Sequence, residues 1–178
     1  MRTTVPNSRI ALSFAVTVVS FLFSCHLANA EEFVRAGIYE YGIYVTSPVI
    51  GADPPSEYGF KHEYVETAEN IEKTQIVPGR VGLQFGVRFF VHTAFSGTPV
   101  WLRIVVRFPP QGLYDLEKGE PAYMDEWLLE RISGEDQFYL WPFEEQWHVE
   151  PGIWAIEIWH DGKKLCEQKF EVVTPPIS

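Results

Sequence analysis

Four residues in the last third of the chain are of the types that transfer protons in enzymes. His148 and Glu150 come just before a strand-like segment at 152–159. His160 and Asp161 come just after it. General acids and bases act together only where they converge in one cleft, and eight extended residues at ~3.3 Å each hold the two pairs ~25 Å apart. We therefore expect all four to be solvent-facing loop residues, and a loop-built hydrolase is the competing hypothesis.

The segment from His62 to Glu66 superficially resembles the motif of zinc proteases. That motif needs two histidines four residues apart on a helix and a third ligand elsewhere. Here the second histidine is missing, and the segment has the pattern of a strand. We predict no metal ion, no cofactor and no catalytic residue. Cys166 is expected to face inward, where a thiol packs as a small apolar group.

Arginines and aromatic rings share the polar faces of the two clearest strands. The residues of this kind are Arg88, Phe90, His92, Trp101, Arg103 and Arg107. Such a surface suits a sugar or an anionic partner, through ring stacking and bidentate contacts from arginine. We predict these six residues to bind a ligand or partner.

The arrangement of the two strands decides whether these six residues form one patch. Neighbouring strands would bring them together, whereas strands in opposite sheets, such as the second and third of an immunoglobulin fold, would separate them. The alternative interpretation is ordinary decoration of outer sheet faces, with arginine stems covering aromatic rings.

The charge balance excludes one class of partner. The 178 residues carry 24 acidic and 14 basic side chains, for a formal charge of −10. Such acidity repels phosphate backbones, so no nucleic acid is expected. The length predicts a single domain.

The first thirty residues have the features of a secretory signal peptide. Arg2 and Arg9 flank the start, an apolar run follows at 10–23, and Ala28-Asn29-Ala30 offers a cleavage site. The run is too short for a membrane span, which needs ~20 residues, and no later segment is long enough without charges. We expect residues 1–30 to be removed and 31–178 to fold as one domain in the periplasm or outside the cell.

A second cleavage site lies inside the leader. Residues 22–25 read LFSC and resemble a bacterial lipobox, in which Cys25 would be lipidated and become the mature N-terminus. Phe23 is a poor residue at its position in that motif. An outer-membrane lipoprotein with a lipid anchor at Cys25 is therefore the minority alternative.

Apolar residues alternate with polar ones along several segments. The clearest are 81–91 and 100–108, each a half-buried strand by its period of two. Strands are also expected at 34–45, 63–67, 72–77, 127–132, 137–143, 152–159 and 166–172. The stretch at 34–45 changes parity, which predicts a bulge or bend between residues 39 and 42. The segment at 126–131 could instead be a helical turn.

The turn signal at 161–162 separates the last two strands. A two-residue loop there would place Ile156 opposite a charged residue. A three-residue loop at 160–162 pairs Ile156 with Cys166 and keeps apolar residues together. Because register follows the buried face, we predict the longer loop, with Gly162 left-handed.

About seven to eight strands without a clear helix predict an all-β fold. We expect an antiparallel immunoglobulin-like β-sandwich, with a closed barrel as the alternative. An α/β enzyme fold is disfavoured because no amphipathic helix separates the strands.

Several motifs resemble those of one bacterial family. They are residues 76–86 (IVPGRVGLQFG), 108–113 (FPPQGL), 151–154 (PGIW), 157–165 (EIWHDGKKL) and 170–172 (FEV). The chain is similar, over most of 34–173, to the domain of unknown function three-eight-five-nine. The resemblance implies an immunoglobulin-like sandwich and a bacterial source, and it implies no catalytic residues.

We therefore expect an exported, non-catalytic binding or accessory module that recognises an envelope protein or glycan. The alternatives are the loop-built hydrolase and a lipid-anchored structural protein.

Overall fold

The computed structural model describes residues 33–56, 59–114 and 119–174, all within one compact unit. The expected leader, its cleavage site and Cys25 lie outside the described residues. Within the described part of the chain, no helix is long and apolar enough to cross a bilayer.

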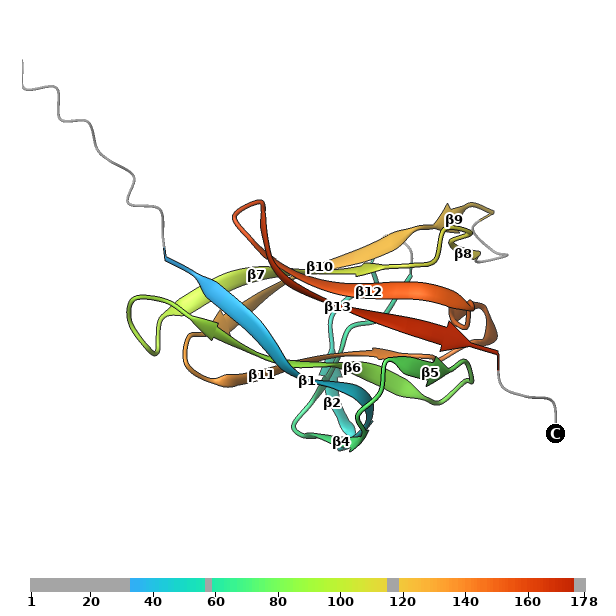
Figure 1. Ribbon diagram of the computed structural model, residues 1–178, viewed down its shortest axis with the longest axis horizontal. Coiled ribbons are helices and arrows are strands. Elements are labelled where there is room, and N and C mark those ends of the chain that lie inside the picture. Colours follow the sequence, from blue (N-terminus) through green and yellow to red (C-terminus); the bar gives the residue numbers. More distant parts are fainter. Residues whose placement is uncertain (1–32, 57–58, 115–118, 175–178) are drawn as a thin grey trace, which may run out of the picture. The chain divides into compact units, whose positions relative to one another are not determined.

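Two β-sheets face each other in the described residues (Figure 1). The first has the strand order β11 (Asp136–Pro142), β6 (Gln84–His92), β1 (Arg35–Thr46) and β4 (Ala68–Glu72). The second has the order β10 (Met124–Ile132), β7 (Pro99–Arg107), β12 (Gly152–His160), β13 (Lys163–Val173) and β5 (Ile76–Pro78). All neighbours are antiparallel except β13 and β5. The predicted immunoglobulin-like β-sandwich is confirmed.

The core lies between the sheets and is formed by the alternating apolar residues. On β6, Phe85, Val87, Phe89 and Val91 are fully buried. Strand β7 contributes the matching inward series at positions 100, 102, 104 and 106. Because side chains alternate across a strand, this pattern leaves the polar residues of both strands on the outer faces. The period-two prediction is confirmed for both segments.

The turn of the last hairpin, between β12 and β13, differs from the predicted one. Strand β12 ends at His160 and β13 begins at Lys163, so the loop has two residues, and the predicted three-residue loop is wrong. Both loop residues have positive φ, 45° at Asp161 and 75° at Gly162, as a type I′ turn requires. A bulge next to Ile158 then shifts the register by one, so that Ile158 faces Cys166. The predicted pairing of Ile156 with Cys166 is therefore also wrong, since Ile156 faces Gln168. The bulge, in place of a longer loop, brings the apolar residues Ile158 and Cys166 opposite each other.

A second bulge lies in β1, where the change of parity predicted one. The register with β6 shifts between Ile38 and Glu40, which leaves Tyr39 without a partner in the pairing. The change brings Ile43 into the core beyond the bulge. This prediction is confirmed.

The expected strand at 72–77 is wrong, because the chain changes sheets within it. Strand β4 ends at Glu72 in the first sheet, and β5 begins at Ile76 in the second. Between them, the hydroxyl of Thr74 accepts a hydrogen bond from the backbone N–H of Ile76, at 3.0 Å. The apolar residues of this stretch do not share one buried face, because Ile71 and Ile76 are exposed whereas Val77 is fully buried. Segment 126–131 lies in strand β10, so the helical alternative is excluded.

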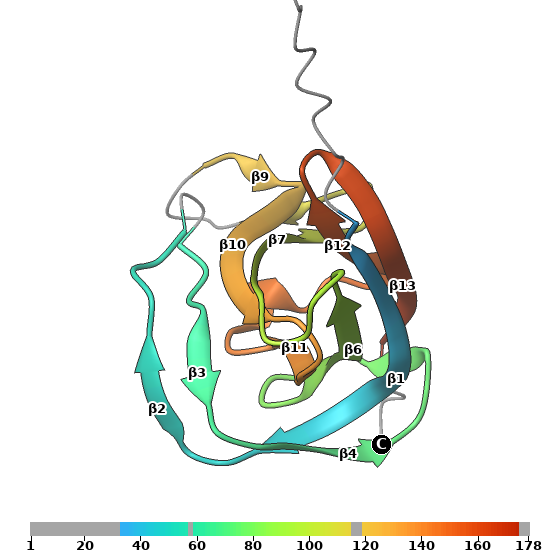
Figure 2. The same cartoon turned by 90° about the vertical axis from the view of Figure 1, so that its left-hand side faces the viewer.

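A hairpin covers one open edge of the sandwich. Among the strands of the described chain, β2 (Val49–Ala52) and β3 (Glu63–Val65) pair only with each other. Figure 2 shows them on the side where β10 and β11 end the two sheets, opposite the side where β1 and β13 meet. A further short pair, β8 (Leu113–Tyr114) and β9 (Pro121–Ala122), precedes β10, and a 3-10 turn at Gln146–His148 precedes β12. The β2–β3 hairpin is the element that shapes the site described below.

A glycine substitution tests how closely β6 and β11 approach each other. A Cβ at Gly86 would come 2.1 Å from the carbonyl oxygen of Tyr139, a backbone atom that cannot move aside. We expect Gly86→Ala to lower the free energy of unfolding by about 2 kcal/mol or more. Chemical denaturation measures this value. Gly51→Ala is the control, since its Cβ makes only ordinary contact at 3.6 Å, and equal losses in both variants would contradict the strand packing.

Candidate functional site

The six expected binding residues do not form one patch. Arg88, Phe90 and His92 belong to β6 in the first sheet, whereas the other three belong to β7 in the second. The two groups therefore lie on opposite outer faces of the sandwich. Sequence reasoning left both arrangements open, and the structure selects the split one. Whether either group binds a partner stays a prediction.

The β6 group is engaged in contacts within the fold. The guanidinium of Arg88 forms ion pairs with Asp136 and with Glu40, the latter at 3.3 Å. It also donates to the backbone carbonyl of Ala68 on β4. The ring of Phe90 covers Gly37, where a Cβ would come within 2.5 Å of it. These contacts tie β11, β6, β1 and β4 together, so Arg88 has a structural role.

The β7 group lies on a more open surface. Trp101 is 55% exposed, and Leu128 on the neighbouring β10 is 59% exposed. Arg103 pairs with Leu128 on one side and with Trp159 of β12 on the other. Its guanidinium lies over the Trp159 ring, 5.5 Å from the centroid, and 3.5 Å from Glu126. We call Trp101, Arg103, Leu128 and Trp159 the Trp101 face.

A buried carboxylate anchors this face. Glu157 on β12 is 4% exposed, although it points to the outer side of the sheet. Arg107 lies 3.1 Å and Lys164 3.2 Å from its carboxylate, and the Trp159 indole N–H donates to it at 2.9 Å. Burial opposes ionisation of Glu157, but the three donors outweigh it and lower the pKa of the carboxyl. Trp159 and Arg107 are thereby held in place.

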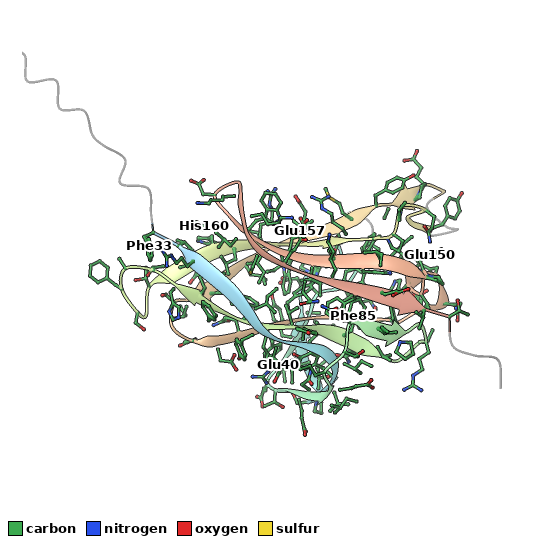
Figure 3. All side chains as sticks on the ribbon, viewed as in Figure 1. Phe33, Glu40, Phe85, Glu150, Glu157 and His160 are labelled. Carbon is green, nitrogen blue, oxygen red and sulfur yellow. The ribbon has the colours of Figure 1, made fainter. Side chains whose placement is uncertain are left out.

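The four acid–base candidates lie in two places, as their spacing predicted. Figure 3 shows Glu150 and His160 at opposite ends of the sandwich, with β12 between them. Glu150 accepts a hydrogen bond from the Gln111 amide at 2.8 Å, and His160 Nδ1 lies 2.9 Å from the carbonyl oxygen of Trp101. This separation gives no support to a shared catalytic cleft.

The environment of His148 differs from the expected one. The residue is only 4% exposed, and its Nδ1 accepts a hydrogen bond from the backbone N–H of Glu144 at 3.3 Å. Its ring packs against Phe60 and Trp147, so the prediction that His148 faces solvent is wrong. Trp147 is adjacent in the sequence, but Phe60 comes from a distant part of the chain, which local spacing does not reveal.

The structure also shows the positions of the segment that resembles a zinc-protease motif and of Cys166. The His62–Glu66 segment contains strand β3, as expected, and no set of three ligating side chains is grouped anywhere in the described chain. Cys166 is half-buried against the core, and burial raises the pKa of its thiol to about 11. At neutral pH this thiol is protonated, so it is a poor nucleophile.

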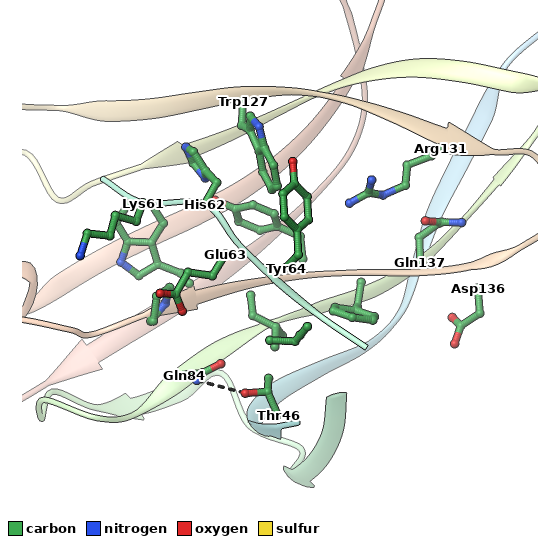
Figure 4. A pocket seen from close by; sticks show the side chains of 16 residues that line it. Thr46, Lys61, His62, Glu63, Tyr64, Gln84, Trp127, Arg131, Asp136 and Gln137 are labelled. Atoms are coloured by element: carbon green, nitrogen blue, oxygen red, sulfur yellow. Dashed lines mark hydrogen bonds between the residues drawn. The ribbon is translucent and has the colours of Figure 1, made fainter. Parts of the chain in front are cut away.

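A cavity that sequence reasoning missed lies beneath the β2–β3 hairpin. Its volume is about 290 Å³, and its walls come from β3, β10 and β11. We call it the edge pocket and define it by Lys61, His62, Tyr64, Trp127, Arg131 and Trp141. Figure 4 shows Arg131 and Gln137 at one end, Lys61 and Glu63 at the other, and Tyr64 with Trp127 between them.

Aromatic stacking and two carboxylates hold β3 over the pocket. The His62 ring stacks on Trp127 with centroids 4.4 Å apart, and its Nε2 lies 3.0 Å from the buried Asp125. The Trp127 indole N–H donates to Asp53, beyond the end of β2, at 2.8 Å. No sequence signal linked these residues, because they come from three separate segments and meet only when the hairpin covers the open edge.

Comparisons with known proteins agree with this fold. Residues 33–172 match the family described as Domain of unknown function (DUF3859). The chain belongs to this family. The match confirms the resemblance that the sequence motifs indicated.

One solved structure extends the agreement. An immunoglobulin-like protein from Pseudomonas aeruginosa matches with a TM-score of 0.56 and 23% identity, covering 81% of this chain and 99% of that one. At this identity the likeness shows the fold alone. No curated protein matches the chain.

The anchor under the Trp101 face makes a pH-dependent prediction. Because the folded-state pKa of Glu157 is lowered, its stabilisation is present above the unfolded pKa of about 4.3 and is lost as pH falls through the folded value. We expect Glu157→Gln to reduce the free energy of unfolding at pH 7 and to weaken its decline below about pH 4.3. Urea denaturation across this range measures both effects. Glu130→Gln, an exposed carboxylate on β10, should leave the acid decline unchanged, and an identical decline in wild type and Glu157→Gln would contradict the role of Glu157.

Proposed function

We propose that this protein is an exported, non-catalytic recognition domain of the bacterial cell envelope. Its family has no assigned activity, so the proposal depends on the leader-like N-terminus and on the outer surface of the second sheet. The Trp101 face is the observation that carries it. The proposed partner is an envelope protein or a glycan.

The composition of the Trp101 face supports a binding role over the alternative of ordinary outer-face residues without a partner. Binding energy at interfaces is concentrated in tryptophan and arginine, and exposed tryptophan is expensive to leave in water. Here an exposed indole, an exposed leucine and a guanidinium stacked on a second indole occupy neighbouring positions of three strands. The guanidinium of Arg103 contacts only Glu126 and the Trp159 ring among the described residues, and its side chain is 42% exposed.

Rigidity also supports this assignment. The face lies on the strands β7, β10 and β12 rather than on loops, and Glu157 accepts a hydrogen bond from the Trp159 indole. Side chains that are already ordered lose less conformational entropy when they bind. The β6 group of Arg88, Phe90 and His92 is the weaker candidate, because its arginine is saturated by internal contacts.

The hydrolase alternative loses support from the separation of the acid–base candidates along β12. A lipid-anchored structural protein remains the other alternative, since it requires no binding face. The state of the N-terminus tests for a lipid anchor, and a variant of Trp101 tests for a binding face. The two alternatives are therefore tested independently.

Removal of the exposed indole tests the binding face. We expect Trp101→Ala to keep the free energy of unfolding within about 0.5 kcal/mol of wild type and to weaken partner capture from an envelope extract severalfold. Ile71→Ala, an equally exposed residue on the first sheet, is the control and should retain capture. A large loss of stability in Trp101→Ala would place the residue in the core and remove the argument for binding.

The mature N-terminus tests the export proposal. We expect mass spectrometry of the chain expressed in a bacterium to find residue Glu31 as a free N-terminus, because the Ala28-Asn29-Ala30 site has the required small residues. An acylated Cys25 would instead establish the lipoprotein alternative. An intact Met1 in a chain that stays inside the cell would contradict export altogether.

A further inference from the structure

The edge pocket contains a cation, Arg131, that has no anionic partner among the described residues. Arg88, Arg103 and Arg107 each form an ion pair with a carboxylate. In the described part of the chain, Arg131 is half-buried, and its only hydrogen bond runs from Nη1 to the carbonyl oxygen of the adjacent Glu130, at 3.0 Å. The charge of a buried guanidinium is costly unless an anion compensates it. Burial accordingly lowers the pKa of Arg131, an effect that nearby Tyr64 only opposes in part.

A second unsatisfied group lines the same pocket. Trp141 is 3% exposed, and within the described residues its indole N–H has no acceptor. Buried polar groups in folded proteins nearly always have a partner, so a water molecule or a ligand is expected to accept this hydrogen bond. The two unsatisfied donors belong to different strands, β10 and β11, and both require an acceptor.

The walls of the pocket restrict what can enter. Trp127, Tyr139 and Leu140 supply flat and aliphatic surfaces, which suit a ring. Glu63 and Asp136 line the cavity together with Lys61 and Arg131, so it has no surplus of positive charge to hold a ligand with two or more negative charges. Asp136 is engaged by Arg88 and Tyr39, so it does not neutralise Arg131.

The size of the pocket matches a small molecule. Small-molecule pockets have volumes of about 300–1,000 Å³, so a volume of about 290 Å³ lies at the lower end of this range. That volume holds a single ring with a short substituent. A planar carboxylate is the single-charge anion that the guanidinium fork pairs with in two parallel hydrogen bonds.

We propose that the edge pocket binds a small organic acid of one ring, with its carboxylate on Arg131 and its ring against the apolar wall of Trp127, Tyr139 and Leu140. This site is distinct from the Trp101 face, which lies on the outer side of the second sheet. Aromatic acids and acidic sugars share the required chemistry of a ring that bears one carboxylate.

Titration calorimetry of the full chain with phenylacetate and with glucuronate distinguishes these two sources. We expect at least one of them to bind saturably at or below millimolar concentration. Phenylacetamide, which keeps the ring but lacks the charge, should bind at least about tenfold more weakly than phenylacetate if the aromatic acid is the ligand. For glucuronate, neutral glucose is the corresponding control.

Variants at Arg131 test the contact itself. Arg131→Gln should weaken binding of the acid by about tenfold or more, and Arg131→Lys should weaken it less, because it keeps the charge but loses the planar fork. Arg103→Gln, on the outer face of the second sheet, should bind like wild type. Circular dichroism verifies that each variant is folded. If Arg131→Gln does not fold, the affinity of Arg131→Lys for the acid is the test.

Three results would overturn the proposal. They are the absence of saturable binding for both acids, equal affinity for an acid and its neutral counterpart, and wild-type affinity in the Arg131 variants. Trp101→Ala should not change the affinity for the acid. A negative result for the edge pocket therefore does not contradict the binding role proposed for the Trp101 face.

Discussion

The structure depends on one constraint, which is that the inner faces of two sheets must mesh around a cluster of aromatic rings. Trp154 on β12 lies at its centre and meets Phe85 edge-on, with centroids 5.9 Å apart (Figure 3 labels Phe85). Phe108, Trp141 and Phe143 surround the same indole, and its N–H donates to the carbonyl oxygen of Glu150 at 2.9 Å. Truncating a buried ring of this kind typically costs about 3–5 kcal/mol. Register, bulges and the placement of surface groups all follow from the need to fill this layer.

The bulges are where this requirement overrides regular pairing. A strand has a side-chain period of two, so a shift of one residue turns every later side chain to the other face. In β1 the bulge at Tyr39 turns Ile43 inward, and in the last hairpin the bulge beside Ile158 lets a tight I′ turn coexist with apolar cross-strand pairs. The same bulge in β1 leaves Tyr39 free to reach Asp136 on the edge strand β11. Local turn chemistry and the core are thus satisfied together.

The two proposed binding surfaces arise from opposite features of the sandwich. The Trp101 face lies on the middle of a sheet, where pairing with β10 and β12 holds side chains in fixed rows. The edge pocket lies where the sheets end, because β10 and β11 do not pair and the β2–β3 hairpin spans the gap. A hairpin that crosses an open edge cannot fill it as densely as a paired strand would. Arg131 and the Trp141 indole are consequently left with donors that no described side chain satisfies.

The sequence by itself determined the class of fold, most of the strands, the bulge in β1 and the family, because these depend on local alternation and on contiguous motifs. It also showed that the acid–base candidates flank a single strand and cannot meet. Only the tertiary structure decided that Arg88 and Trp101 lie on different sheets, that His148 is buried, and that His62, Trp127 and Arg131 surround one cavity. The physical reason is that these relations join residues from distant segments, and the pairing order of strands is set by how the whole core packs rather than by the spacing along any one strand.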